Sequence, residues 1–265
     1  MRLFAIGDLH LPGGDEKPMS VFGPQWDRHF LRISEAWRET VREEDAVLIP
    51  GDISWAMKLE DALPDLEAIG ALPGRKVLIR GNHDYWWSSI SRIRSLLPEN
   101  MYALQNDAVD LGDWVVCGTR GWMIPGMEDG GGEENEKIYA REVNRLALAL
   151  DCAARIGKGK PTVVMLHYPP RTSQVPASGF SHLLEERGVR LCVYGHLHGN
   201  GIQAAFNGTE RGVRYMLTSC DSLGFRPIRV DGATEEADRD AGPEADGTPR
   251  PSFEPETLRP EDEPR

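Results

Sequence analysis

Five short apolar runs in the sequence are each followed by residues of the types that bind divalent metal ions. Carboxylate, imidazole and amide-oxygen groups suit hard and borderline cations, and the absence of thiolates from these positions argues against a structural zinc knot. A carboxylate such as Asp52 can also bridge two cations and hold them about 3.5–4 Å apart. The runs span residues 3–6, 46–49, 76–79, 162–166 and 191–194, and the groups that follow them are Asp8 and His10, Asp52, Asn82 with His83 and Asp84, His167, and His196 with His198.

Most histidines of the sequence are concentrated in these groups. Five of the 7 histidines follow the apolar runs, whereas His29 and His182 lie on predicted helices. A lone histidine after a strand is more often a hydrogen-bonded residue than a ligand, and a lone Gly-Asp pair is an ordinary turn, but five such coincidences favour one shared site. In four of the groups a glycine directly precedes the first ligand, where it permits unusual backbone angles and a close approach to a bound ion.

The strands that carry these groups alternate with helical segments. Apolar spacing predicts helices over residues 26–41, 59–69, 88–97, 133–155 and 180–187, and two or three strands within residues 101–118. Asn207-Gly208 predicts a hairpin between strands at residues 201–206 and 213–218. The alternation is typical of an α/β fold with mixed sheets covered by helices, in which ligands bind beyond the carboxyl ends of the strands. The five groups are expected to meet there.

The order of the motifs resembles that of a known family, the calcineurin-like metallophosphoesterases. DxH, GD, GNHD, a lone H and GHxH follow one another from Asp8 to His198, with no member missing. The resemblance implies a four-layer α/β/β/α sandwich of two mixed β-sheets flanked by helices, with a dinuclear metal site at its edge. The forms GNHDYWW and YGHLHG are similar to those of a bacterial branch of predicted phosphohydrolases whose substrates are poorly defined.

The resemblance also implies a role for each residue of the motifs. One metal ion would be held by Asp8, His10 and His198, the other by Asn82, His167 and His196, and Asp52 would bridge the two. The two divalent ions, Mn, Fe or Zn, would bind the phosphoryl oxygens and lower the pKa of a bridging water, and the resulting hydroxide would attack phosphorus in line with the leaving oxygen.

His83 is expected beside the leaving group, as a general acid or as a stabiliser of the departing alkoxide. Asn82 and His83 are also expected to contact the substrate. Asp84 is suited to hydrogen-bond and orient His83 and to raise its pKa; the alternative is a structural carboxylate with no kinetic role.

Several residues near the motifs allow two interpretations. Tyr85, Trp86 and Trp87 either form an aromatic wall for the substrate or pack in the core, and core packing is favoured for the two tryptophans. Tyr168 and Arg171 follow His167 and are placed to contact phosphate, although a solvated loop position is favoured for Arg171. Residues 125–134 are rich in glycine and acid, so we expect a surface loop rather than a lid over an anionic substrate.

Charge and composition divide the chain into two parts. The formal net charge is −12, and residues 231–265 hold 12 acidic and 4 basic side chains, so this segment accounts for −8 and residues 1–230 for −4. We expect a metallophosphoesterase domain over residues 1–230 and an acidic, proline-rich disordered tail over residues 231–265, because the tail offers little apolar surface to offset its ordering entropy. The overall charge argues against a general binder of nucleic acid or membrane surfaces.

The cysteines and the hydropathy pattern indicate a cytoplasmic protein. Cys117, Cys152, Cys192 and Cys220 show no CxxC spacing and are interpreted as free thiols in a reducing compartment. No apolar stretch approaches the roughly 18 residues of a membrane span, and the N-terminus lacks the pattern of a signal peptide. No membrane partner is expected, and the oligomeric state is not readable from the sequence.

The sequence therefore predicts an enzyme that hydrolyses a phosphomonoester or phosphodiester, most simply of a small molecule. One alternative is a nuclease, which would require basic residues near the motifs or a capping domain; neither is evident, but nucleic acid stays open as a substrate. The other alternative is a catalytically silent binding scaffold. Such a protein would be expected to lack metal ligands or the histidine of GNH, and all of them are present here.

Overall fold

The computed structural model describes residues 1–13, 19–127 and 131–232, and all of these except Gly232 belong to one compact unit, Met1–Asp231. The predicted tail lies outside the described residues apart from its first two positions, and the loop at 125–134 lies partly outside them. The disorder of the tail, the domain boundary at residue 230 and the role of the loop therefore stay predictions.

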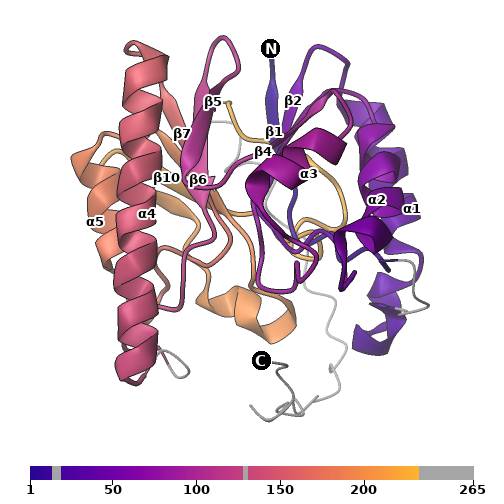
Figure 1. The fold of residues 1–265 in the computed structure, drawn as a ribbon. Helices are drawn as coiled ribbons and strands as arrows, with labels where there is room; N and C mark the ends of the chain where they lie inside the picture. The colour runs from indigo at the N-terminus through magenta and orange to yellow at the C-terminus, as the bar shows by residue number, and fades with distance from the viewer. Residues whose placement is uncertain (14–18, 128–130, 233–265) are drawn as a thin grey trace. The chain divides into compact units, whose positions relative to one another are not determined.

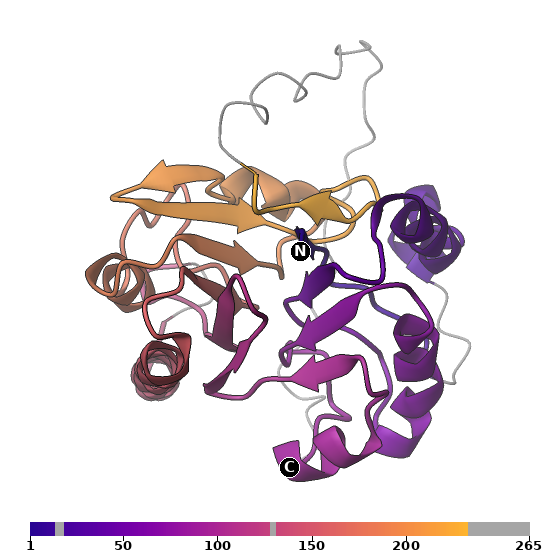
Figure 2. The same ribbon diagram turned by 90° about the horizontal axis from the view of Figure 1, so that it is seen from above.

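The first sheet follows the N-terminal half of the chain. Its strand order is β11 (Ile228–Arg229), β1 (Leu3–Ala5), β2 (Ala46–Ile49), β3 (Arg75–Leu78) and β4 (Met101–Ala103). β1 to β4 run parallel, and β11 lies antiparallel to β1. Helices α1 (His29–Thr40), α2 (Leu59–Gly70) and α3 (Ile90–Leu96) lie on the outer face of this sheet (Figures 1 and 2).

The second sheet follows the C-terminal half of the chain. Its order is β5 (Asp107–Asp110), β6 (Val115–Thr119), β7 (Thr162–Leu166), β8 (Leu191–Tyr194), β10 (Val213–Leu217) and β9 (Gly208–Glu210). The four middle strands run parallel, and the two edge strands are antiparallel to their neighbours. Helices α4 (Glu133–Gly157) and α5 (Gly179–Glu186) cover its outer face (Figure 2).

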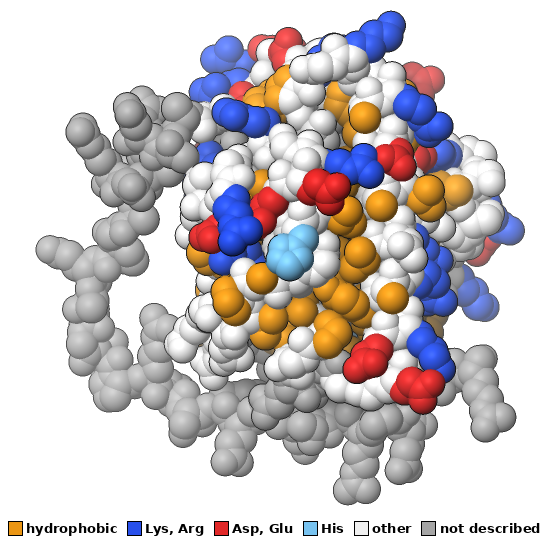
Figure 3. All heavy atoms as spheres, turned by 90° about the vertical axis from the view of Figure 1, so that its left-hand side faces the viewer, with side chains coloured by type: hydrophobic (Ala, Val, Ile, Leu, Met, Phe, Trp, Pro, Cys, Tyr) orange, Lys and Arg blue, Asp and Glu red, His pale blue; other side chains and the backbone are white. Residues whose placement is uncertain are grey.

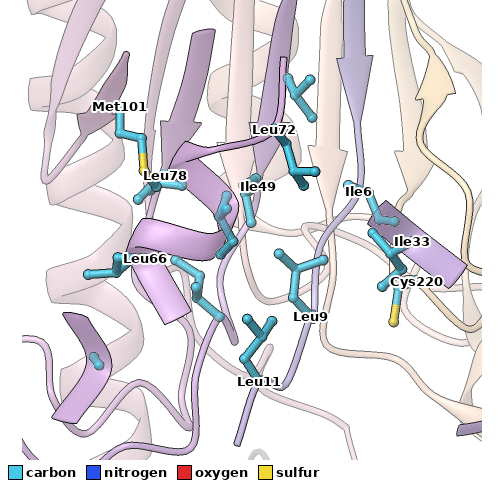
Figure 4. Packing of buried hydrophobic residues seen from close by; sticks show 14 of the residues in the cluster. Ile6, Leu9, Leu11, Ile33, Ile49, Leu66, Leu72, Leu78, Met101 and Cys220 are labelled. Atoms are coloured by element: carbon cyan, nitrogen blue, oxygen red, sulfur yellow. The ribbon is translucent and has the colours of Figure 1, made fainter. Parts of the chain in front are cut away.

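Three apolar layers hold the four layers of the sandwich together. Alternate residues of each central strand point to opposite faces, so Phe4 packs toward α1 and α2 while Leu3 packs between the sheets. Because both faces of each sheet are covered, β1, β2 and β8 are apolar along most of their length, as expected for buried parallel strands. Figure 4 shows part of the layer under α1 and α2, to which Ile6, Ile49 and Leu66 all belong. The predicted α/β/β/α architecture is confirmed.

The predicted helices are confirmed with small shifts of their ends, but one predicted strand is wrong. Residues 201–206 contain no strand; the 3-10 helix η3 (Gly199–Ala204) occupies this segment, and Ile202 and Ala205 pack against the second core layer at a spacing of one 3-10 turn. The hairpin is present between β9 and β10, but it turns at Arg211-Gly212 rather than at Asn207-Gly208. Asn207 instead accepts a hydrogen bond from the Leu217 amide through its side chain (2.8 Å).

The surface charge and the helices of the described part bear on two kinds of partner, nucleic acid and membranes. Figure 3 views the side of the unit where α4 and α5 lie, and acidic, basic and apolar side chains are interspersed on this face. This face therefore offers no continuous basic patch of the kind that binds nucleic acid. No helix among the described residues is long and apolar enough to cross a membrane.

Candidate metal centre

The loops that follow five parallel strands meet at one edge of the sandwich. β1, β2 and β3 of the first sheet and β7 and β8 of the second each end just before a predicted ligand. The two sheets are connected at this edge, because the Gly7 amide donates to the Thr218 carbonyl (2.6 Å) and the His196 amide donates to Asp8 Oδ1 (2.9 Å). Residues far apart in the sequence are thereby brought within contact distance.

Asp8, His10 and His198 form a first ligand group. His10 Nε2 lies 3.3 Å from His198 Nε2, which lies 3.4 Å from Asp8 Oδ1. Each of the three residues offers one atom that can bind a metal ion, and these three atoms lie within 4.8 Å of one another. Asp8 and His10 are buried, whereas the His198 side chain is 30% exposed, so this group faces solvent on one side.

Asn82, His167 and His196 form a second ligand group. Asn82 Oδ1 lies 2.6 Å from His167 Nε2 and 2.9 Å from His196 Nδ1. His167 is fully buried, and its other ring nitrogen, Nδ1, lies 3.0 Å from the Pro50 carbonyl oxygen. A hydrogen bond donated from Nδ1 to that carbonyl leaves the Nε2 lone pair free to bind a cation.

Asp52 lies between the two groups. Its Oδ2 is 3.8 Å from His10 Nε2 in the first group and 3.5 Å from His167 Nε2 in the second. Its Oδ1 accepts a hydrogen bond from the His83 amide (2.8 Å), which fixes the orientation of the carboxylate. Asp52 is the residue through which one ion could be linked to another.

Unusual backbone conformations are concentrated at these ligands. Asp8, His10, Asp52 and His196 all have positive φ, with values of 55°, 45°, 49° and 74°. They make up four of the nine non-glycine residues with positive φ in the described part of the chain. This conformation is unfavourable for residues with a Cβ atom, and its clustering at one place is typical of functional sites.

Two of the glycines that precede ligands are required by close approach. A Cβ atom added at Gly81 would fall on Oδ1 of Asp52, and one added at Gly195 would fall on Oδ2 of Asp8. Neither carboxylate has room to move away, because both are buried. The glycines in the GNH and GHxH motifs therefore admit the carboxylates to the centre.

The two central carboxylates differ: Asp52 lacks sufficient positive charge around it, whereas burial of Asp8 is outweighed by its hydrogen bond with His198, which holds the pKa of Asp8 below its usual range. Burial, followed by the charges of Asp8 and Asp84, raises the pKa of Asp52 well above its usual range. Asp8 Oδ2 is buried and has no hydrogen-bond partner among the described residues. An anionic oxygen without a donor is costly in a protein interior, and a divalent cation would satisfy it. The donor set therefore fits the metal ions that the sequence predicts.

The imidazole pKa values differ between the two groups. Burial, followed by the charge of His167, lowers the pKa of His196 to about 3. Burial disfavours protonated His198 as well, but its hydrogen bonds to Asp221 and Asp8 outweigh this effect and raise its pKa to about 10. In the metal-free chain at neutral pH, His196 has a free lone pair, whereas His198 holds a proton that a cation must displace.

Asp84 does not hydrogen-bond the His83 ring, contrary to the prediction from the sequence. Its Oδ2 accepts from the Gly81 amide (2.7 Å), and its Oδ1 accepts from the Ile53 amide (2.8 Å) and the Trp86 indole (3.0 Å). His83 Nδ1 is buried without a hydrogen-bond partner in the described part, and burial, followed by the charge of His167, lowers the pKa of His83 to about 4. The carboxylate is fully used by backbone amides and the indole, so the expectation that it raises the His83 pKa is wrong.

The neighbouring aromatic and basic residues separate into core and surface. Trp86 and Trp87 are buried in the core, as favoured, while Tyr85 is 47% exposed and its ring lies 6.3 Å from that of His83. Arg171 is not a solvated loop residue; it is buried and stacks on Phe206 at 4.0 Å. The Tyr168 ring lies 4.2 Å from that of His196, and its contact with phosphate stays a prediction.

Sequence reasoning missed three residues that contact the ligands. The Trp55 ring stacks on His10 at 5.0 Å and lies 4.5 Å from the ring of His83. The Trp26 ring lies 5.8 Å from the ring of His198 and 6.0 Å from that of His10. Asp221 Oδ1 lies 2.9 Å from His198 Nδ1. A signal for Asp221 was present, because it follows β10 in the same way as the predicted ligands follow their strands.

Comparison with known proteins gives one family and several similar folds. The family model described as calcineurin-like phosphoesterase matches residues 1–200. The Gene 66 protein of Mycobacterium phage D29 is 48% identical over 59 residues, which are 21% of this chain and 28% of the phage protein, so the chain matches little more than a quarter of that curated relative.

Two solved structures cover most of this chain at low sequence identity. The phosphopantetheinyl hydrolase of Mycobacterium tuberculosis has a TM-score of 0.51 at 14% identity, over 86% of this chain and 95% of its own. A protein of unknown function from Aquifex aeolicus has a TM-score of 0.48 at 14% identity, over 86% and 94%. At this identity the first likeness shows a shared fold.

Proposed function

From the premise that this chain belongs to the calcineurin-like phosphoesterases, we propose that it hydrolyses phosphate esters with two divalent metal ions held by its two ligand groups. The observation that carries this proposal is the position of Asp52, whose Oδ2 lies within 4 Å of a histidine of each group. A single carboxylate between two sets of ligands is suited to a site that holds two metal ions close together.

Each ligand group would hold one ion, of Mn, Fe or Zn. Asp8, His10 and His198 would hold the first, Asn82, His167 and His196 the second, and Asp52 would contact both. When bound, the ions supply Lewis-acid polarisation of the phosphoryl oxygens and a nucleophile at neutral pH. The chain itself contributes a rigid frame, because ligand residues of three loops are held in the left-handed conformation and backbone hydrogen bonds tie the loops together.

His83 would donate a hydrogen bond to the substrate. Its backbone amide donates to Asp52, and its ring lies 4.5 Å from the ring of Trp55, tilted by 46°. Since its pKa is lowered to about 4, a neutral imidazole meets the substrate at neutral pH, and it acts as an N–H donor to the phosphoryl or leaving oxygen. The negative charge of the arriving phosphate favours a proton on His83 and brings it closer to general-acid function.

Asp84 would act as a positioning residue. It joins the Gly81 amide to the amides of Ile53 and Ser54, so it connects the loop after β3 with the loop after β2. These two loops carry Asn82 and Asp52. Loss of Asp84 would therefore allow the distance between Asn82 and Asp52 to vary.

A panel of esters assayed with and without metal tests the proposal. The purified chain is stripped with a chelator, reloaded with Mn²⁺, Fe²⁺ or Zn²⁺, and assayed on bis-aryl phosphate, aryl phosphate, cyclic nucleotides, single-stranded nucleic acid and a phosphopantetheinyl ester. Chelation is expected to abolish hydrolysis of at least one small ester, and one of the three metals is expected to restore it.

Two double variants, one in the metal centre and one on the surface, provide the test and its control for this assay. Asp52→Asn/His198→Ala is expected to remove metal-dependent hydrolysis, whereas Asp113→Asn/His182→Ala, at exposed positions far from the centre, is expected to retain it. Hydrolysis that survives chelation, or that persists in the first double variant, contradicts the two-metal proposal. If the chain hydrolyses only the nucleic acid of this panel, its substrate class is nucleic acid rather than small-molecule esters.

A further inference from the structure

A carboxylate outside all the predicted motifs lies directly behind His198. Asp221 Oδ1 is 2.9 Å from His198 Nδ1, and its Oδ2 accepts from the Gly199 amide (3.1 Å). The Asp221 side chain is 8% exposed, against 30% for His198. Asp221 also lies beyond residues 1–200, which the family model matches, so neither the motifs nor that match assigns it a role.

The segment that carries Asp221 is held against the loop of Asp8. The Cys220 amide donates to the Gly7 carbonyl (3.0 Å), and Cys220 Sγ donates to the Asp8 carbonyl (3.0 Å). The Phe225 amide returns to the Cys220 carbonyl (2.7 Å), and the Phe225 ring packs edge-on against Trp26 at 5.2 Å. Asp221 is thus placed by the same backbone that places Asp8.

The two ring nitrogens of His198 have different surroundings. Nδ1 faces Asp221, which can only accept when ionised, so a proton on Nδ1 is donated to the carboxylate. Nε2 faces His10 Nε2 at 3.3 Å and Asp8 Oδ1 at 3.4 Å, where the first ligand group converges. His167 in the second group has the same division of roles, but its Nδ1 partner is the neutral Pro50 carbonyl.

We propose that Asp221 is a positioning residue for the first ligand group, which holds the Nδ1–H tautomer of His198, directs Nε2 at the cation and strengthens its binding. The inference rests on the proposed function for the presence of two cations. A carboxylate behind a histidine ligand fixes the ring and increases its basicity, and losing such a partner reduces metal affinity by about 10–100-fold. Asp221 therefore gives the two ligand groups unequal metal affinity, although it belongs to none of the motifs.

Metal titrations of three variants test this role. Asp221→Asn keeps the size of the side chain and an acceptor for the Gly199 amide but removes the charge, and Asp221→Glu keeps the charge. Ser222→Ala changes the same loop at a side chain whose one hydrogen bond among the described residues goes to the Ser219 carbonyl. Mn²⁺ binding to the chelator-stripped chains is followed by calorimetry at one constant pH, about 8, because proton competition makes affinity depend on pH.

The expected result is a loss confined to one site. Asp221→Asn weakens one of two Mn²⁺ affinities by about 10–100-fold and leaves the other within about twofold, with the melting temperature of the metal-free chain unchanged; Asp221→Glu recovers part of the loss, and Ser222→Ala shows none. Equal loss at both sites, no loss at either, or a fall in melting temperature that accounts for the loss overturns the proposal.

A spectroscopic measurement decides the question without any variant. Long-range ¹H–¹⁵N spectra of the Zn²⁺-loaded wild-type chain, with histidine labelled, report which nitrogen of His198 carries a proton. A proton on Nδ1 is expected, and a neutral ring protonated only at Nε2 overturns the proposal. A chain that binds two cations with this affinity pattern but hydrolyses no ester refutes the proposed function alone.

Discussion

The two ligand groups hold similar atoms in different environments. The first group combines a carboxylate with two imidazoles and includes a half-buried histidine backed by Asp221; the second combines an amide with two imidazoles and is backed by a backbone carbonyl. The first group therefore carries more negative charge. We therefore expect the two cations of the proposed site to bind with unequal affinity and unequal dependence on pH.

The largest effect is expected from removing the residue that joins the groups. Asp52→Asn withdraws a charge from both, so phosphoesterase activity should fall by about 10³-fold, or roughly 4 kcal/mol of transition-state stabilisation. Steady-state kinetics at saturating Mn²⁺ measure this, with Asp113→Asn as the matched exposed control. A fall of less than tenfold would mean that the groups act independently of Asp52.

A smaller effect is expected when only one group is broken. Asn82→Ala removes the oxygen to which His167 and His196 both point, so the second group should lose its ion and the first should keep it. Metal analysis after gel filtration should find the bound Mn²⁺ reduced by half, and activity should fall by about 10²-fold. Complete loss of metal would show that the first group cannot hold an ion alone.

The pH dependence of stability should have opposite signs in the two groups. Folding lowers the pKa of His196 from 6.5 to about 3, so the unfolded chain binds an extra proton in this window and stability falls as pH falls from 6.5 toward 3. Folding raises the pKa of His198 from 6.5 to about 10, so its contribution is complete below pH 6.5 and is lost as pH rises toward 10.

Two variants separate these contributions, each on the order of 1–3 kcal/mol. Melting temperatures of the metal-free chain are measured across pH for wild type, His196→Gln and His198→Gln. His196→Gln should lose less stability than wild type as the pH falls below 6.5. His198→Gln should lose less stability than wild type as the pH rises above 6.5. Parallel curves for all three chains would contradict the assigned directions.

The smallest effect is expected at a residue that belongs to neither group. Tyr85 is exposed beside His83, and an exposed aromatic contact contributes about 1 kcal/mol or less. Tyr85→Ala should raise KM for aryl esters by a few-fold, leave KM for alkyl esters unchanged, and leave both Mn²⁺ affinities unchanged. A change in metal binding would place Tyr85 within the centre rather than at its rim.

The ligands could be predicted because strand position and residue type coincide in the sequence. Asp8, Asp52 and His167 each follow a buried parallel strand, and the carboxyl ends of such strands share an edge. The partner of Asp84 was not predictable in this way, because GNHD does not state whether the carboxylate faces a side chain or backbone amides. Residues 201–206 were misassigned because a short apolar run fits a strand and a 3-10 turn equally well.

The antiparallel pairing of β11 with β1 also bears on how the protein is made. Residues 228–230 complete the sheet whose first strand leads to Asp8, and Thr218 and Cys220 bond the backbone of Gly7 and Asp8. A chain emerging from the ribosome N-terminus first exposes Asp8 and His10 long before these partners exist. The first ligand group is therefore assembled late, and we expect metal loading to follow translation rather than to guide it.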